Sequence, residues 1–128
     1  MITVQAPVSL VRSLNVALRG GLEAGVVSAL AYWGVHAADG TAGKVLLGIA
    51  APAVGFGIWG AVDFRWFGRY AEPLRLTEEL VISGLAAAAL AVAGQPALAV
   101  GLAALSVVHH ALVYALGDRL LKPGPAGG

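Results

Sequence analysis

The stretch VALRGGLEAGVVSALAYWGV, residues 16–35, decides the fold of this chain. A helix of about 20 residues, at about 1.5 Å per residue, is long enough to cross the hydrocarbon part of a bilayer. Two residues of the stretch, Arg19 and Glu23, are charged. A charge at the centre of a membrane helix costs about 2.5 to 3.5 kcal/mol, so this helix must lie against helices that carry matching polar groups.

Three further apolar runs follow, so the sequence predicts an all-α, polytopic membrane protein with four transmembrane helices. Their expected bounds, with the first, are 16–35, 45–62, 76–93 and 97–116. Composition agrees, because 59% of the residues are hydrophobic and 12% are charged, which is more apolar than a soluble domain of this size. Short turns at 38–41 and 94–96 and a longer polar stretch at 63–73 predict an up-down bundle made of two helical hairpins.

The predicted transmembrane domain covers residues 15–118. Residues 1–14 are expected to remain as an N-terminal segment on the cytoplasmic side, because a cleavable signal has an uninterrupted apolar core and the first apolar stretch here contains charges. Residues 119–128 end in Lys-Pro-Gly-Pro-Ala-Gly-Gly, which has nothing to bury, and are expected to form a disordered cytoplasmic tail.

The basic residues predict the orientation in the membrane. Of the eight Lys and Arg residues, only Lys44 lies on the side of the two tight turns. The others flank the termini and the long loop, and such residues are held on the cytoplasmic side. We therefore expect a multi-pass protein of the bacterial inner membrane or plasma membrane, with both termini cytoplasmic.

Polar residues within the spans form the predicted site. Positions 12, 15, 19 and 23 share one helix face, and the polar residues of the third and fourth spans lie at similar depth. We expect a polar cluster in the cytoplasmic half of the bundle, formed by Asn15, Arg19, Glu23, Glu78, Glu79, His109, His110 and Tyr114. Adjacent helical residues point about 100° apart, so the sequence leaves open which glutamate and which histidine of each pair faces inward.

Two interpretations of this cluster are open. In the first, its charges neutralise one another and its hydrogen bonds fix helix order, each contributing about 0.6 to 2 kcal/mol, which suits a packing or accessory membrane protein. In the second, Glu23 and a histidine of the fourth span exchange protons or bind a cation, which suits a small proton-coupled transporter or ion pathway. Length and a first-helix glutamate are similar to the small multidrug resistance transporters, although Arg19 would neutralise that glutamate.

The sequence does not indicate an enzyme. Cysteine is absent, and His109 and His110 diverge too far on a helix to share one metal ion easily. No catalytic, metal-binding or cofactor-binding residue is therefore predicted, and a net charge of +1 gives no reason to expect nucleic acid as a partner. The expected partners are the lipid bilayer and, through small-residue faces such as Gly21-x-x-x-Gly25, a homodimer or a larger membrane complex.

The two predicted hairpins share one short motif. Leu18-Arg19 followed by Glu23 recurs as Leu74-Arg75 followed by Glu79, a weak internal repeat that agrees with two similar hairpins.

Several motifs carry a resemblance to a known family. They are Asn15-x-x-Leu18-Arg19 with Glu23, Tyr32-Trp33-Gly34, Leu47-Gly48-Ile49-x-x-Pro52 with Trp59-Gly60, and Leu74-Arg75-Leu76 with Glu79. In these the chain resembles the small bacterial four-helix membrane proteins labelled YrdB, whose function is not known. It departs from them at His109-His110, where such proteins tend to carry an Asn-Arg pair. The resemblance implies a membrane location and four helices, and it implies no activity.

Overall fold

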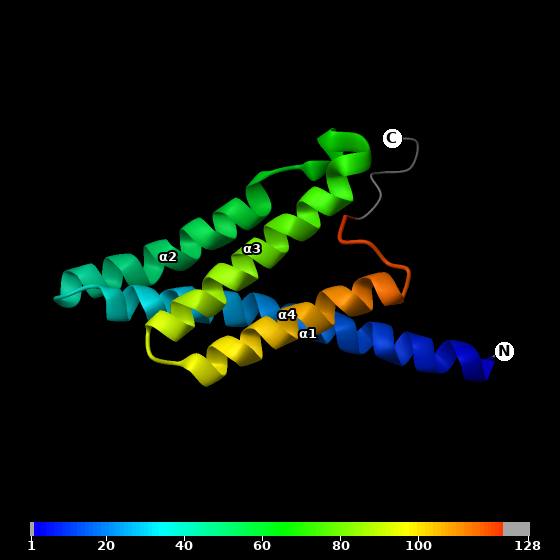
Figure 1. Ribbon diagram of the computed structural model, residues 1–128, viewed down its shortest axis with the longest axis horizontal. Coiled ribbons are helices and arrows are strands. Elements are labelled where there is room, and N and C mark those ends of the chain that lie inside the picture. Colours follow the sequence, from blue (N-terminus) through cyan, green and yellow to red (C-terminus); the bar gives the residue numbers. More distant parts are fainter. Residues whose placement is uncertain (1, 122–128) are drawn as a thin grey trace.

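The computed structural model describes residues 2–121, with side chains from Pro7 onward. It contains four long helices and one short 3-10 helix: α1 (Ile2–Ala37), α2 (Thr41–Ala61), η1 (Phe64–Tyr70), α3 (Ala71–Val92) and α4 (Pro96–Ala115). No strand occurs among the residues described. The predicted all-α fold with four helices is confirmed. Figure 1 shows the helices running back and forth, with η1, the start of α1 and the end of α4 at one end of the molecule.

Turn chemistry explains where α3 and α4 end. After α3, Gly94 adopts a φ of +88°, and the amide of Gln95 donates to the carbonyl of Leu90 at 2.8 Å. After α4, Gly117 adopts a φ of +78°, and the amide of Asp118 donates to the carbonyl of Val113 at 2.8 Å. Glycine takes a positive φ without steric cost, so both helices finish in the same left-handed cap.

The two terminal segments predicted from the sequence differ in the structure: the N-terminal segment is helical, and the first residues of the C-terminal segment are bound to the bundle. Residues 2–15 continue α1 instead of preceding the first helix as a separate segment. Of the predicted tail, residues 122–128 lie outside the described part. The preceding residues lie against the start of α3, where the Glu72 carboxylate accepts hydrogen bonds from the amides of Leu120 (2.7 Å) and Leu121 (3.1 Å).

The helices are not equivalent in the bundle. α1 contacts the three other long helices and α3 contacts α1, α4 and the end of α2, whereas α2 and α4 do not contact each other. α1 and α3 are therefore the central pair, and α2 and α4 flank it. The central pair carries the arginines and glutamates of the spans, while α2 contains Lys44 alone and α4 has no Asp, Glu, Lys or Arg. The two helices with the fewest charges thus lie on the outside.

Small residues bring α1 and α2 into backbone contact. A Cβ atom added at Gly34 would overlap the backbone carbonyl of Leu47. One added at Gly48 would lie 2.8 Å from a methyl group of Val35. These glycines belong to two of the motifs quoted above, so the motifs meet at the crossing of the first hairpin.

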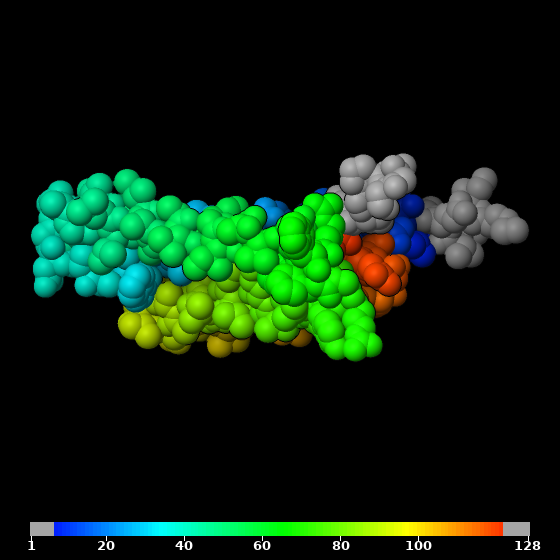
Figure 2. Space-filling model, turned by 90° about the horizontal axis from the view of Figure 1, so that it is seen from above, coloured from blue at the N-terminus to red at the C-terminus, as the bar shows by residue number. Residues whose placement is uncertain are grey.

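Two of the helices, α2 and α4, are long and apolar enough to cross a membrane. Length and composition thus support two of the four predicted spans, and α1 and α3 are not among them. Figure 2 shows α2, coloured cyan to green, as a long exposed strip beside α3. Trp59 is the only residue of α2 that is buried.

Candidate functional site

Glu79 of α3 is the centre of the polar site, and its side chain is only 1% exposed. Its carboxylate accepts hydrogen bonds from Arg19 of α1 at both oxygens, with Nη2 to Oε2 at 3.2 Å. Nε of Arg75 donates to Oε2 at 2.7 Å, and Nε2 of His110 lies 2.9 Å from Oε1. Three helices therefore meet at one carboxylate. We call Arg19, Glu23, Arg75, Glu78, Glu79 and His110 the Glu79 cluster.

Helical spacing positions both arginines. Arg75 and Glu79 are four residues apart and therefore share a face of α3, and Arg75 also contacts Glu78 at 3.3 Å. The same spacing joins Arg19 and Glu23 on α1, at 2.9 Å. The two copies of the sequence repeat thus meet, because Arg19 of the first copy bridges to Glu79 of the second.

The end of α2 is tied to the same cluster. Nη1 of Arg75 donates to the carbonyl of Trp59 at 2.9 Å. This carbonyl lies in the last turn of α2, where no helical amide remains to pair with it. The guanidinium of Arg19 lies over the Trp59 ring, 5.0 Å from its centroid, a cation–π contact. All four helices therefore contribute to the cluster.

The structure answers the question that the sequence left open about the glutamate pair: Glu79 faces the interior, while Glu78 lies beside Arg75 at the edge. Glu23, predicted as the carboxylate of a proton or cation site, is 43% exposed, and Arg19 is its one ion-pair partner in the described part of the chain. Among the residues described, no hydrogen bond joins Glu23 to a histidine. The acid and the imidazole that do meet are Glu79 and His110.

Both histidines of the pair are buried, and they serve different contacts. Nδ1 of His110 lies 2.7 Å from the carbonyl of Ser106, and its Nε2 faces the Glu79 carboxylate. Since both nitrogens face oxygen acceptors, this geometry suits an imidazole with a proton on each. Nδ1 of His109 lies 2.8 Å from Oδ1 of Asn15, which joins α4 to α1 beside the Glu79 cluster.

Tyr114 lies outside the cluster. Its hydroxyl donates to Glu72 at 2.6 Å, at the start of α3. Glu72 also holds the segment after α4, and Arg12 contacts Asp118 of that segment at 3.0 Å. Tyr114 therefore helps to close the end of the bundle.

Sequence reasoning missed Arg75 and a buried serine pair. Arg75 stands four residues before Glu79, the spacing that was used for Arg19 and Glu23, so the same signal would have found it. Oγ of Ser83 donates to the carbonyl of Glu79, and Oγ of Ser106 lies 2.8 Å from Oγ of Ser83. Nothing in the sequence pairs these serines, because their contact depends on how α3 and α4 pack.

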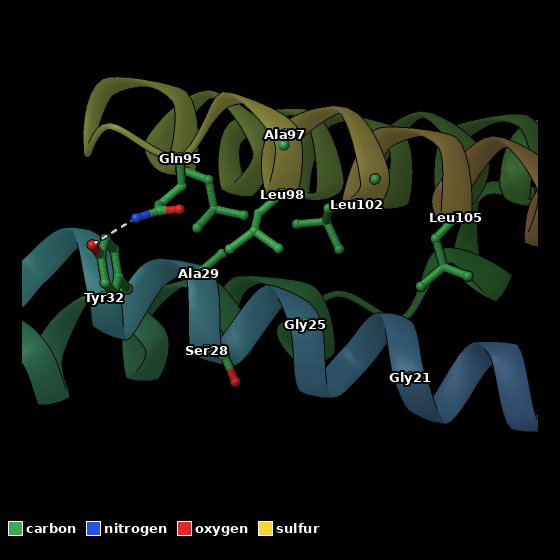
Figure 3. Close-up of a pocket in the computed structure, with 12 residues that line it drawn as sticks. Gly21, Gly25, Ser28, Ala29, Tyr32, Gln95, Ala97, Leu98, Leu102 and Leu105 are labelled. Carbon is green, nitrogen blue, oxygen red and sulfur yellow. Dashed lines mark hydrogen bonds between the residues drawn. The ribbon is translucent and has the colours of Figure 1, made fainter.

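Two cavities lie between α1 and α4. The first, about 390 Å³, is bordered by glycines and leucines and closed at one end by the bond from Gln95 Nε2 to the Tyr32 hydroxyl, 3.1 Å (Figure 3). The second, about 750 Å³, lies between α1, α4 and the segment after α4, and we call it the end cavity. Its lining includes Arg19 and His109 but neither Glu23 nor Glu79, so the central carboxylate is sealed from it. Within residues 2–121, no three His, Asp or Glu side chains are grouped as metal ligands.

The fold and the site together define a small all-helical protein in which two apolar helices flank a pair of helices joined by buried ion pairs. A family model described as a protein of unknown function (DUF2568) matches residues 17–107, more than half of the chain. The chain belongs to this family. The matched segment contains Arg19, Glu79 and Arg75, and it ends before His109. Neither a curated protein nor a solved structure matches the chain.

Proposed function

We propose that this protein is a four-span integral membrane protein that acts by helix packing, as an accessory protein held together by the Glu79 cluster. The observation that carries the proposal is the complete pairing of Glu79. A buried carboxylate that accepts hydrogen bonds from two guanidinium groups and one imidazole has no oxygen left free for a transported proton or cation. Such pairing is typical of a structural contact.

The charge balance of the cluster supports the same role. Its three carboxylates, on Glu23, Glu78 and Glu79, face the guanidinium groups of Arg19 and Arg75. The imidazole of His110 lies 2.9 Å from the Glu79 carboxylate and adds a third partner to it. Charges paired in this way are far less costly inside a membrane than separate charges.

The placement of these charges supports four spans. α1 and α3 turn the Arg19, Arg75 and Glu79 side chains toward each other, so the paired groups need not contact lipid. The arginines gather at the end that holds η1 and both ends of the described chain, which favours a cytoplasmic location for that end. This arrangement fits the small bacterial membrane proteins labelled YrdB, and we propose that the resemblance is genuine.

The outer face of α2 is the surface that we assign to a partner. Leu46 (68%) and Ile49 (66%) are exposed along it, and α2 contacts little beyond α1. Gly25, part of the predicted Gly21-x-x-x-Gly25 face, is occupied within the chain, because an added Cβ would lie 2.9 Å from Leu102. We therefore place self-association, or contact with a larger membrane complex, on α2.

Energy transfer between labelled copies in liposomes tests the packing role. The wild-type protein should give a signal that survives dilution into more lipid, and a double change of Leu46→Ala and Ile49→Ala should lower it. Val100→Ala is the matched control, because Val100 is equally exposed (70%) but lies on α4. Two results together would contradict the proposal: the protein stays monomeric at every lipid ratio in liposomes, and deletion of its gene alters no membrane complex in cells.

One observation favours the alternative of a proton or ion pathway: Arg19 and His109, at the edge of the cluster, line the end cavity. In that case the residues of the pathway would be Glu79 and His110, in place of the Glu23 and fourth-span histidine that the sequence suggested. Proton release from the purified protein on addition of candidate cations, lost in a folded Glu79→Gln variant, would establish the pathway and exclude a purely structural cluster.

A further inference from the structure

The end cavity has a basic lining. Arg12 and Arg19 line it from α1, Arg119 lines it from the segment after α4, and Asp118 is the only acidic residue in the described lining. Arg12 donates through Nε to Asp118 (3.0 Å) and through Nη2 to the carbonyl of Leu116 (3.2 Å), which leaves its Nη1 without a bond among the described residues. The Arg119 side chain likewise makes none of the described hydrogen bonds. The lining therefore contains guanidinium N–H donors that the described residues do not use.

His109 supplies the second, independent observation. Its side chain lines the end cavity, although only 4% of the residue is exposed. Nδ1 is committed to Asn15 at 2.8 Å, and Nε2 has no partner among the described residues. Buried polar atoms in proteins are nearly always hydrogen-bonded. Nε2 is therefore a buried ring nitrogen, on a residue that lines the cavity, whose hydrogen-bonding capacity the described residues leave unused.

We propose that the end cavity binds a phosphate group, carried by a lipid headgroup or by a soluble phosphate ester. Guanidinium groups match phosphate oxygens in geometry and charge, and Arg12 and Arg119, whose donors the described residues do not fully use, approach from two sides. The cavity, at about 750 Å³, has room for the phosphate and the group esterified to it. The site does not depend on self-association through α2.

The chemistry of His109 selects phosphate among the anions. With its second pKa at about 6, a phosphate monoester has both ionised oxygens and P–OH groups accessible near neutral pH. It can therefore accept a hydrogen bond from Nε2 or donate one to it, whichever tautomer His109 holds. An ionised carboxylate can only accept, and a metal cation is repelled by the arginines. Arg19 is paired with two acidic residues. These residues are Glu23 and Glu79, and neither is among the lining residues of the end cavity.

The test uses the full chain in phosphatidylcholine nanodiscs. Binding of glycerol 3-phosphate measures the soluble source, and retention of phosphatidic acid, followed by native mass spectrometry, measures the lipid source. Arg119→Gln should weaken binding about tenfold, as expected for the loss of one charge-assisted hydrogen bond. Arg69→Gln is the matched control, because it removes the same charge at the same end, where the Arg69 guanidinium bonds to the Tyr70 hydroxyl and is not part of the described cavity lining. It should change binding less than about twofold.

His109→Gln removes the ring nitrogen and should weaken binding about as much as Arg119→Gln. If that variant does not fold, Arg119→Gln decides, because its side chain makes no described contact that the fold requires. Binding of glycerol 3-phosphate alone assigns a soluble ligand, and retention of phosphatidic acid alone assigns a headgroup. The proposal is wrong if neither binds, if glycerate binds as tightly as glycerol 3-phosphate, or if Arg69→Gln weakens binding as much as Arg119→Gln.

Discussion

Replacing Glu79 by glutamine is the sharpest perturbation of the Glu79 cluster. Glutamine keeps the shape of the side chain and removes its charge, so Arg19, Arg75 and His110 lose their shared anion while the packing stays the same. The new amide also places donor hydrogens where Oε1 or Oε2 accepted two bonds. Both consequences act on a side chain that is 1% exposed, where water does not compensate.

Removing one partner of a buried ion pair costs about 3 to 5 kcal/mol. The two arginines are partly reached by solvent, so we expect the lower end of this range, about 3 kcal/mol, for Glu79→Gln. Glu23→Gln is the matched control: Glu23 is 43% exposed and Arg19 is its one ion-pair partner among the described residues, so the loss should be under about 1 kcal/mol.

The free energy of unfolding is measured for both variants in one mixed-detergent titration, with helicity as the readout. The ratio of the two losses matters more than either value, because both substitutions make the same chemical change. Equal losses for Glu79→Gln and Glu23→Gln, or a more stable Glu79→Gln protein, would refute the claim that Glu79 holds the central helices together.

Two further substitutions probe other parts of the molecule. Gly34→Ala should lower the free energy of unfolding by about 1 to 3 kcal/mol or more in the same titration, because the new Cβ would overlap the Leu47 carbonyl. Gly21→Ala is the control: its new Cβ meets open space, so this change should stabilise α1 by about 0.5 to 1 kcal/mol. Comparable effects of the two substitutions would contradict the α1–α2 crossing. In the loop before η1, a side-chain hydrogen bond from Arg65 lowers the pKa of Asp63. The contribution of this pair to stability is therefore present above the ordinary aspartate pKa and is lost as pH falls through the lowered pKa. Carboxyl NMR titration should give a higher Asp63 pKa in Arg65→Gln, and an unchanged value would exclude the bond.

The helices were predictable because each is an apolar run that ends in turn residues. α2 begins at Thr41 and α4 at Pro96, within a few residues of the expected starts. The part of α1 before Arg12 was not predicted as helix, because residues 2–11 form no continuous apolar run. η1 also escaped prediction, since its first turn depends on Asp63 accepting a bond from the Arg65 amide.

The residues of the site were easier to predict than its connections. Depth along the helices placed Arg19, Glu79 and His110 together, and the structure joins these three. Which glutamate lies at the centre depends on the rotation of α3 about its axis, which a 100° step between neighbours cannot decide. Glu23 was predicted as the carboxylate of a proton or cation site because local spacing is visible in a sequence, and contacts across 60 residues are not.

The long separation between Arg19 and Glu79 has a consequence for biogenesis. In a membrane, α1 leaves the ribosome with its guanidinium about 60 residues ahead of the carboxylate that later neutralises it. Until α3 emerges, Glu23 is the only acidic residue that pairs with Arg19 among the described contacts. Moving the incompletely paired guanidinium into lipid is costly, so we expect the nascent first hairpin to remain at the insertion machinery until then. On the four-span topology that we propose, insertion of the first helix would be completed by synthesis of the third.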